Sequence, residues 1–133
     1  MEKTLVLVKP DGVKRNLLGK IISRYENRGL CIENIKMLTP SESLLRKHYE
    51  EHLEKPFFKD LLKFMTSGNV VAMIISGENA VEAVRMVNGA TDSLKALPGT
   101  IRGDFGLDKT MNLVHGSDSL QSAEREINIW FFN

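Results

Sequence analysis

Cysteine is almost absent from this sequence: Cys31 is the single one among 133 residues. A disulfide framework is therefore excluded, and we expect Cys31 to be a buried core thiol in a reducing compartment, the cytoplasm. Long apolar runs are absent too, since the longest, from Val70 to Ile75, has only the length of a strand. We therefore predict no membrane partner, and the chain length suits one domain that comprises residues 1–133.

The sequence also lacks a strong charge of either sign, because 18 Lys and Arg oppose 17 Asp and Glu. Without a basic stripe and interleaved aromatic residues, we do not expect nucleic acid to be a required partner. Two common phosphate-binding patterns, GxxxxGK[ST] and GxGxxG, do not occur either. The segment from Gly12 to Lys20 comes near the first, but its glycines are too far apart and the residues between them favour a helix. A Walker-type or Rossmann-type nucleotide site is therefore not expected.

Short apolar segments alternate with segments of helical periodicity. Strands are predicted at residues 4–8, 30–38, 70–75 and 113–114, and helices at residues 13–29, 39–52, 57–65, 79–87 and 120–129. Helix caps are expected at Thr39-Pro-Ser-Glu, at Asn79 and between Ser117 and Ser119. The stretch from Gly89 to Asn112 has repeated glycines and little periodicity, so it is predicted to be a long functional loop. This order predicts an α/β (α+β) fold of the ferredoxin-like split βαβ kind, with a four-stranded antiparallel sheet covered by helices.

The segment His48-Tyr49-Glu50-Glu51-His52 matches the HxxEH pattern, in which two histidines one helical turn apart bind zinc. A zinc peptidase is thus one alternative. A pattern with two free positions recurs by chance, however, and a peptidase needs a third ligand and a substrate cleft. Exposed helix histidines without a metal are the favoured interpretation.

The most informative segment is NLVHGSD, from Asn112 to Asp118, where a short strand delivers His115 to a glycine turn just before a helix. Gly116 allows a substrate to approach closely, and the exposed amide groups at the start of a helix attract anions. Neutral imidazole is a nucleophile at physiological pH, and Glu126 or a neighbouring residue on the following helix is expected to accept a hydrogen bond from the ring and orient it. His115 is therefore a candidate nucleophile, although a histidine at one such position is ordinarily a half-buried residue with satisfied hydrogen bonds.

Phosphoryl transfer mainly requires cations that are positioned around the phosphates. The sequence supplies Lys9 at the end of the first strand and Arg85 on the helix after the third. Arg102 lies in the glycine-rich loop, with Thr91 nearby as a hydroxyl donor. Taken one at a time, the basic residues would be expected to form surface salt bridges. Together with His115 they indicate a phosphotransferase.

At NLVHGSD the sequence resembles the nucleoside diphosphate kinase family. Other segments agree with this resemblance through nearly the whole chain: LVKPDGVKR, HYEEHLEKPFF, SGNVVAMIISG, GATDSLKALPGTIRGDF and SAEREINIWF. The resemblance implies the split sandwich fold and a ping-pong enzyme, in which His115 takes the terminal phosphate of a nucleoside triphosphate and passes it to a nucleoside diphosphate. It also implies Mg²⁺ as a cofactor that bridges the phosphates, with no metal ligand from the protein, and a homo-oligomer, a hexamer or a tetramer.

The resemblance further implies a role for individual residues. Lys9 and Asn112 would meet the ribose hydroxyls, and Arg85, Thr91 and Arg102 would hold phosphate oxygens. Tyr49 would lie beside the transferred group, while Ser117 and Glu126 would support His115. The nucleotide base would lie against Phe57, Leu61 and the aliphatic stem of Lys109.

The sequence departs from the family pattern at Asp92-Ser93, where the family commonly has Asn-Pro in a loop at subunit contacts. The loss of this proline removes a restricted φ angle. The chain also ends at Asn133, where longer relatives have a C-terminal tail. These departures bear on the oligomeric state.

A second alternative beside the zinc peptidase is a catalytically silent relative that acts as a nucleotide-binding or scaffold protein. The intact active-site residues argue against it.

Overall fold

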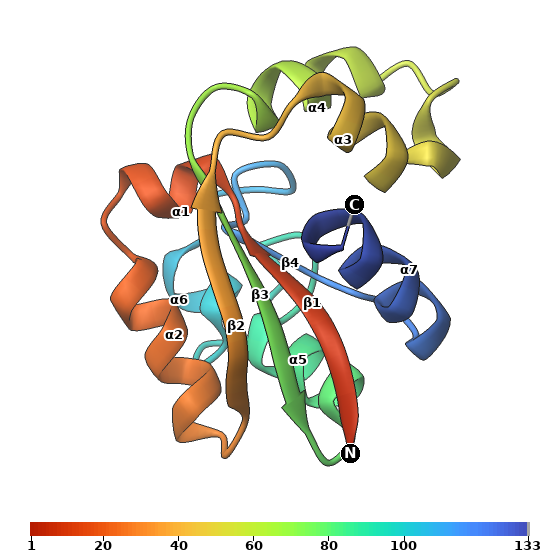
Figure 1. Ribbon diagram of the computed structural model, residues 1–133. Coiled ribbons are helices and arrows are strands. Elements are labelled where there is room, and N and C mark those ends of the chain that lie inside the picture. Colours follow the sequence, from red (N-terminus) through yellow and green to blue (C-terminus); the bar gives the residue numbers. More distant parts are fainter. Residues whose placement is uncertain (133) are drawn as a thin grey trace.

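A four-stranded antiparallel sheet forms the centre of the protein in the computed structural model, which describes residues 1–132 (Figure 1). The strands follow the order β2-β3-β1-β4 across the sheet. They are β1 (Glu2–Val8), β2 (Cys31–Leu38), β3 (Val70–Gly77) and β4 (Val114–Gly116). Each neighbouring pair is antiparallel. The predicted fold class is thereby confirmed.

Helices cover both faces of this sheet. They are α1 (Pro10–Lys14), α2 (Leu18–Asn27), α3 (Glu42–His48), the 3-10 helix η1 (Glu50–His52), α4 (Phe58–Met65), α5 (Ala80–Asn88), α6 (Ile101–Phe105) and α7 (Leu120–Phe131). Side chains of α2, α5 and α6 pack on one face of the sheet, and those of α3, α4 and α7 pack on the other. None of the helices in residues 1–132 is long and apolar enough to cross a membrane.

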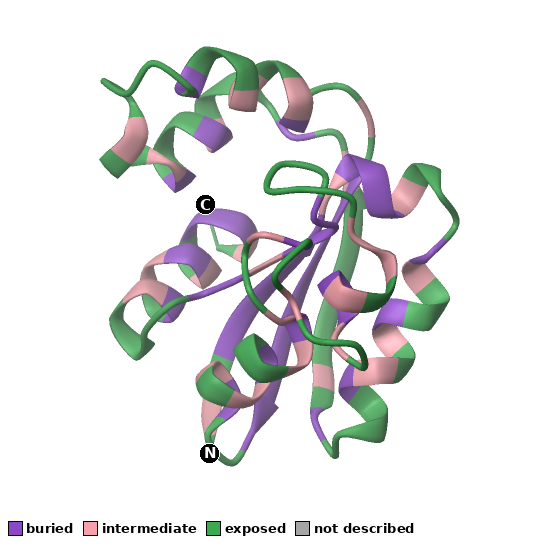
Figure 2. Cartoon of the chain, turned by 180° about the vertical axis from the view of Figure 1, so that it is seen from behind, coloured by how far each residue is buried: buried purple, intermediate pink, exposed green. Residues whose placement is uncertain are grey.

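The central strands β1 and β3 are buried on both faces, as their purple colour in Figure 2 indicates. Val6 and Val8 of β1 join the core under α2 and α5, whereas Leu5 and Leu7 join the core under α3 and α7. Alternate residues of a strand point to opposite faces, so a strand covered on both sides must be apolar throughout. This is why the uninterrupted apolar run at residues 4–8 correctly predicted a strand.

The predicted helix at residues 13–29 is wrong in its extent, because the chain forms two helices there. The first, α1, begins at Pro10, directly after β1, and its end is followed by Asn16 with a φ angle of 58°. Asparagine tolerates this left-handed conformation better than most residues, and it breaks the helical path before α2. Apolar periodicity continues across the break, so the pattern did not reveal it.

The expectation that Cys31 is buried is also wrong, since its side chain is exposed. Cys31 begins β2, which is an edge strand with mostly exposed residues. An apolar stretch in an edge strand need not be covered within one chain. Its alternation therefore indicated the strand but not its burial.

Two further segments differ from their predictions. The helix expected at residues 39–52 ends at His48, and η1 follows as a separate turn. The loop expected between Gly89 and Asn112 contains α6, whose N-cap Thr100 accepts a hydrogen bond from the amide of Gly103 at 3.0 Å. A helix of five residues is too short to show periodicity.

The predicted caps have a mixed outcome. Ser41 and Ser119 accept hydrogen bonds from the amides of Leu44 and Ser122, as serine caps do. Asn79 precedes α5 but makes no capping hydrogen bond with its side chain. The carboxylate of Glu2 instead accepts from the amide of Val81 at 3.2 Å, a contact between distant segments that local sequence could not indicate.

Candidate active site

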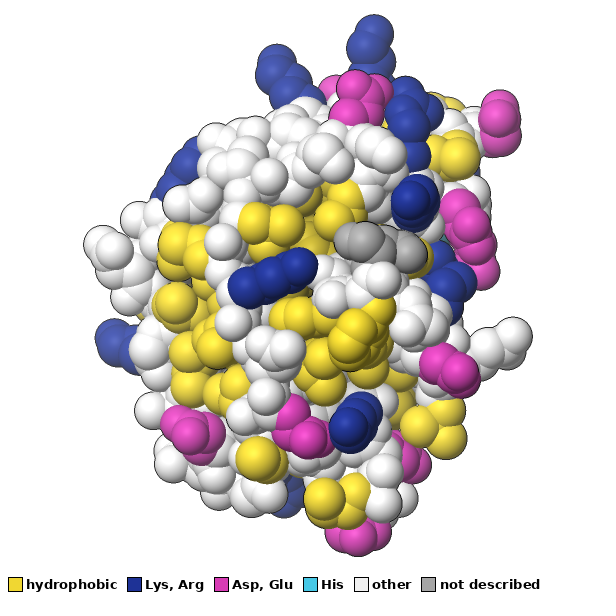
Figure 3. All heavy atoms as spheres, in the orientation of Figure 1, with side chains coloured by type: hydrophobic (Ala, Val, Ile, Leu, Met, Phe, Trp, Pro, Cys, Tyr) yellow, Lys and Arg dark blue, Asp and Glu magenta, His cyan; other side chains and the backbone are white. Residues whose placement is uncertain are grey.

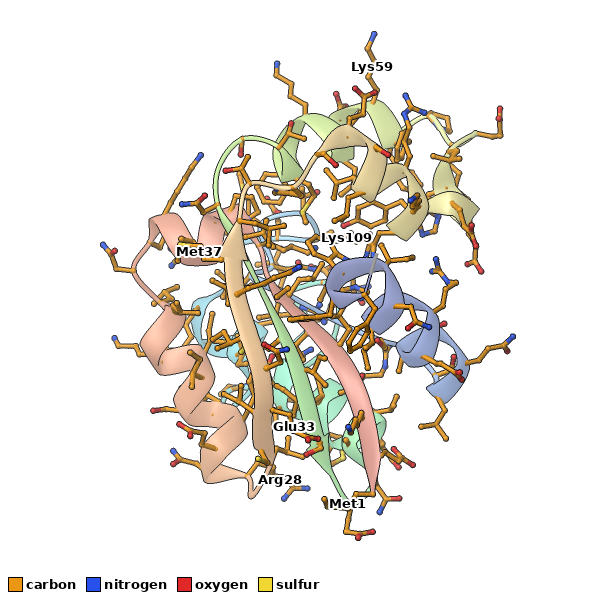
Figure 4. The ribbon with its side chains drawn as sticks, in the orientation of Figure 1. Met1, Arg28, Glu33, Met37, Lys59 and Lys109 are labelled. Carbon is orange, nitrogen blue, oxygen red and sulfur yellow. The ribbon has the colours of Figure 1, made fainter. Side chains whose placement is uncertain are left out.

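A polar cavity of about 360 Å³ lies where β4, the end of α5, α6 and α7 meet the α3–η1 segment. Most of the predicted site residues line it: Lys9, Tyr49, Arg85, Thr91, Arg102, Lys109, Asn112, His115 and Glu126. Figure 4 labels Lys109 between the α3–α4 pair and α7. The fold thus brings together side chains that are widely separated in the sequence.

His115 occupies the middle of β4, where it pairs with Leu7 of β1. Its Nε2 lies 2.9 Å from Oε1 of Glu126, and the Ser117 hydroxyl donates to the same oxygen at 2.6 Å. Burial by itself would raise the pKa of Glu126, but the hydrogen bond and charge of His115, with His48 and Ser117, hold that pKa below its ordinary value. Glu126 is therefore a carboxylate that accepts from the Nε2–H of His115.

This contact fixes the tautomer of His115. When Nε2 carries the proton, Nδ1 holds the free lone pair. Nδ1 makes no hydrogen bond with any residue from 1 to 132, and the His115 side chain is 22% exposed on the cavity wall. The arrangement leaves one ring nitrogen anchored by Glu126 and the other available as a nucleophile.

The buried ring of His48 lies against that of His115, with 4.7 Å between the ring centroids and an interplanar angle of 77°. Its Nδ1 accepts a hydrogen bond from Nε1–H of Trp130 at 3.0 Å. Burial and, secondly, the neighbouring charge of His115 lower the pKa of His48 well below its ordinary value. His48 is therefore neutral, with its proton on Nε2. Sequence analysis missed this, because it treated the histidine as an exposed helix residue.

The geometry does not fit the zinc alternative. Because α3 ends at His48, the pair His48 and His52 does not lie on one continuous helix. His48, His115 and Glu126 do bring ligand atoms within 4.8 Å of one another. A histidine that binds metal normally donates a hydrogen bond from its other nitrogen, but Nδ1 of His48 accepts one from Trp130. Its Nε2 carries a proton and is not a free ligand.

Arg102 is held rigidly at the cavity by backbone carbonyl oxygens. Its guanidinium donates to Gly89 at 2.9 Å, to Asn112 at 3.3 Å and to Val114 at 2.6 Å. Burial lowers its pKa, and the nearby Arg85 lowers it further. A guanidinium has five N–H donors, so donors remain for an incoming anion. Arg85 lies close by and donates to the carbonyl of Gly116 at 3.5 Å.

Lys9 follows β1 and donates from Nζ to Oδ1 of Asn112 at 2.9 Å. Burial, with a smaller effect of the Arg102 charge, lowers the pKa of Lys9 to about 8. The amide nitrogen of Asn112 donates to the carbonyl oxygens of Thr91 and Lys109, each at 3.0 Å. Lys9 and Asn112 are thus held together by hydrogen bonds at the cavity wall.

Asp11 anchors the segment that leads to His115, and sequence analysis missed it. Leu113 adopts a φ angle of 75°, which is uncommon for a bulky side chain. Its amide donates to Oδ2 of Asp11 at 3.2 Å, and its carbonyl accepts from the amide of Lys9 at 2.8 Å. Burial raises the pKa of Asp11, and the charge of Lys9 opposes this. Its place in the sequence, directly after the predicted strand and Lys9-Pro10, could have marked Asp11 as a residue near the site.

The remaining predicted residues lie outside the cavity wall. Ser117 is buried behind Glu126. Phe57, before α4, is 49% exposed, and its ring lies 5.5 Å from that of His52. Leu61 packs against the core on the α3, α4 and α7 side of the sheet. Phe57 and Leu61, which were predicted to contact the nucleotide base, thus do not line the cavity. The residues predicted to bind phosphate, Arg85, Thr91 and Arg102, do line it.

A nucleophilic side chain beside fixed cations is the equipment that phosphoryl transfer needs. The fold and the site together define a phosphotransferase.

Comparisons with known proteins agree with this class. The model of the family "Nucleoside diphosphate kinase" matches residues 2–133. The nucleoside diphosphate kinase of Caldanaerobacter subterraneus subsp. tengcongensis is 63% identical over 131 residues, which cover 98% of this chain and 94% of the relative. That of Thermobifida fusca is 56% identical over 131 residues, covering 98% and 97%.

Solved structures give the same result. The enzyme of Encephalitozoon cuniculi has a TM-score of 0.97 and 40% identity, with 100% of this chain and 90% of that chain covered. The halophilic enzyme of Halobacterium salinarum, solved in complex with CDP, has a TM-score of 0.96 and 48% identity, covering 99% and 88%. The chain belongs to the nucleoside diphosphate kinase family, as the sequence segments predicted.

Proposed function

We propose that this protein transfers the terminal phosphate of a nucleoside triphosphate to a nucleoside diphosphate and carries it on His115 between two half-reactions. The observation that carries this proposal is the free Nδ1 of His115, since its Nε2 is held 2.9 Å from Glu126 inside a cavity with buried cations. Membership of the family and the CDP complex of the Halobacterium salinarum enzyme support nucleotides as substrates.

The first half-reaction begins with Nδ1 of His115. Its lone pair attacks the terminal phosphorus, the N–P bond forms, and the bond to the bridging oxygen breaks with its electron pair leaving on the diphosphate. Positive charge develops on the ring, and the buried carboxylate of Glu126 stabilises it through Nε2–H. In the second half-reaction, a terminal oxygen of another nucleoside diphosphate attacks the phosphorus and forms the new P–O bond. The N–P bond breaks, its electron pair returns to Nδ1, and neutral His115 is restored.

The other residues position the nucleotide in this proposal. Arg85, Thr91 and Arg102 bind phosphate oxygens, and the rigid mounting of Arg102 supports that role. Lys9 and Asn112 bind the ribose hydroxyls, and Tyr49, on the cavity wall, lies beside the transferred group. The base stacks on Phe57, flanked by Leu61 and the stem of Lys109.

Mg²⁺ is the proposed cofactor. It prefers oxygen ligands in octahedral geometry and usually keeps several waters. Among the carboxylates on the cavity wall, Glu126 is already engaged by His115 and Ser117, which leaves Glu51 and Asp118. This sparse donor set supports the proposal that the nucleotide phosphates hold the metal. When bound, the ion neutralises charge on the phosphates.

The proposed compartment is the cytoplasm. Cys31 is exposed and is the single cysteine of the sequence, so it has no partner for an intramolecular disulfide. A reducing compartment preserves such an accessible thiol.

Brief exposure of the purified protein to ATP and Mg²⁺ tests the proposed function. We expect a mass increase of one phosphate that is labile in acid and stable in base, because a phosphoramidate bond has these properties and a phosphoester does not. A protein that binds nucleotide without any mass increase would instead be the catalytically silent relative.

We predict that the base identity has little effect on the rate. The half-exposed Phe57 ring stacks on any base, and such stacking is worth about 1–3 kcal/mol regardless of its identity. Loss of the 2′-hydroxyl should also cost little, whereas loss of the 3′-hydroxyl, which faces Lys9 and Asn112, should cost much. The measurement is kcat/KM for ATP, GTP, CTP, dATP and a 3′-deoxy analogue. A preference above roughly 10³-fold for one natural base, about 4 kcal/mol, would contradict this prediction.

We also propose a homo-oligomer, a hexamer or a tetramer. The edge strand β2 exposes Ile35 by 46% and Met37 by 53%, and Figure 3 shows hydrophobic side chains gathered on the face that carries this strand. The patch continues to the apolar end of α7, where Nζ of Lys36 lies 4.9 Å from the ring of Phe131. An unpaired strand edge and an apolar patch both favour association with a second copy.

Light scattering is expected to give an assembly at micromolar concentration, despite Asp92-Ser93. Met37→Lys, which places a charge on the exposed edge strand β2, should weaken the assembly, because burying an unpaired charge is costly. A stable monomer of the unaltered protein would refute this prediction.

A further inference from the structure

Asn88, the last residue of α5, is a polar side chain in the wall of the cavity to which neither the mechanism nor the family resemblance gives a role. It is only 1% exposed. Its Oδ1 accepts a hydrogen bond from the hydroxyl of Tyr25 on α2 at 2.5 Å. Tyr25 is itself fully buried, which keeps the hydroxyl protonated and able to donate. The carbonyl end of the Asn88 amide is thus fixed in one direction.

The opposite end of the amide has no partner. Nδ2 of Asn88 makes no hydrogen bond within residues 1–132. It lies next to Gly116, since a Cβ atom added at Gly116 would be 2.9 Å from it. Gly116 directly follows His115, and all three residues line the cavity. Nδ2 therefore borders the cavity as a free donor, and a ligand that enters the cavity can supply its acceptor.

The surroundings of Asn88 indicate which acceptor fits. Arg102 donates to the carbonyl of Gly89, the next residue in the chain, at 2.9 Å. Arg85 stands one turn earlier on α5 and donates to the carbonyl of Gly116 at 3.5 Å. Both cations therefore converge on the end of α5 where the free amide lies. An anionic oxygen beside them accepts readily from a neutral N–H.

We infer that Asn88 is a further binding residue, whose Nδ2 donates to an oxygen of the phosphoryl group that passes to and from His115. Tyr25 is a positioning residue that acts through Asn88. The inference rests on the proposed function, because it assigns the ligand of the same cavity. It adds a neutral donor beside the cations and the nucleophile. This donor is held by a tyrosine of α2, which packs on the same face of the sheet as α5.

The test compares Asn88→Leu, Tyr25→Phe and the double variant with the unaltered protein. Leucine keeps the approximate volume of asparagine and removes the donor. We expect Asn88→Leu to lower kcat/KM and the single-turnover rate of His115 phosphorylation by about 10-fold or more, the usual effect of losing a hydrogen bond to a charged group. Tyr25→Phe should lower both by a smaller factor. The double variant should be no slower than Asn88→Leu, because Tyr25 acts only through Asn88.

Asn88→Asp and Asn27→Leu serve as matched variants. Aspartate keeps the acceptor for Tyr25 but presents a negative oxygen to the phosphoryl group, so the phosphorylation rate should fall further than in Asn88→Leu. Asn27 lies on the exposed end of α2, outside the cavity, and its change to leucine should leave the rate unaltered. Thermal unfolding of each variant measures effects on stability separately.

Two results would overturn the inference. If Asn88→Leu and Tyr25→Phe lower the unfolding temperature but are phosphorylated at the unaltered rate, the pair has only a structural role. If Asn88→Leu does not fold, an unaltered rate in Tyr25→Phe together with Asn88→Asp has the same meaning. Absence of phosphate uptake by the unaltered protein is a different result, since it overturns the proposed function and this inference with it.

Discussion

Replacing His115 with alanine is expected to leave a folded protein that binds nucleotide and transfers phosphate only at background level. Among residues 1–132, His115 is the histidine that Glu126 anchors by one ring nitrogen while the other stays free, so the covalent intermediate has no equivalent carrier. The phosphate cations remain, because Arg102 is held by backbone carbonyls and not by the histidine. Binding and transfer should therefore separate in this variant.

Folding of this variant is expected because the loss is local. Glu126 keeps its hydrogen bond from Ser117 and loses one from His115, at a cost of about 1–3 kcal/mol. Calorimetric titration with a nucleotide and the steady-state rate measure the two properties. Turnover above a small residual, in a preparation free of the unaltered enzyme, would contradict the assignment of His115.

The second large effect is expected from removal of a buried cation. Arg102→Ala or Lys9→Ala should slow transfer by about 10²-fold or more, the size of a lost preorganised charge contact in comparable sites. Both side chains are fixed before substrate arrives, Arg102 by carbonyls and Lys9 by Asn112. Little reorganisation is then needed during the reaction, which is why the contribution is large.

The two variants should differ in stability. Arg102→Ala leaves the carbonyls of Gly89, Asn112 and Val114 without their donor, so its unfolding temperature should fall clearly. Lys9→Ala removes one side-chain hydrogen bond and a buried charge with a lowered pKa, so it should be destabilised less. Measured kcat/KM together with thermal unfolding separates the effects. Unaltered kcat/KM in both variants would refute the proposal that Arg102 and Lys9 bind the nucleotide.

Strands that are covered on both faces of the sheet were predictable from the sequence. A sheet covered on both faces requires apolar runs, and β1 and β3 have them. The break at Asn16 and the short helix α6 were not predictable, because each depends on a few local dihedral angles without periodicity. The exposure of Cys31 depends on strand order, since the same sequence in a central strand would be buried.

A site residue was predictable where the residues that support it lie close to it in the sequence. His115, Gly116 and the start of the following helix lie within one short segment, and Glu126 is on that helix. His48, Asp11 and Asn88 were missed because their partners are remote. Trp130 is 82 positions from His48, Leu113 is 102 from Asp11, and Tyr25 is 63 from Asn88. A residue whose role is set by such a partner shows no pattern in its own neighbourhood.

The contact between Lys9 and Asn112 joins positions 103 residues apart and has a consequence for biosynthesis. Closing so long a loop is an entropic cost that native packing must offset, so this pair forms late in folding. Glu126 lies later still in the chain, on α7, which follows the whole sheet in the sequence. A nascent chain therefore has most of its sheet before it has a working histidine. Recovery of phosphate transfer after denaturation should accordingly coincide with the last, and not the first, structural phase of refolding.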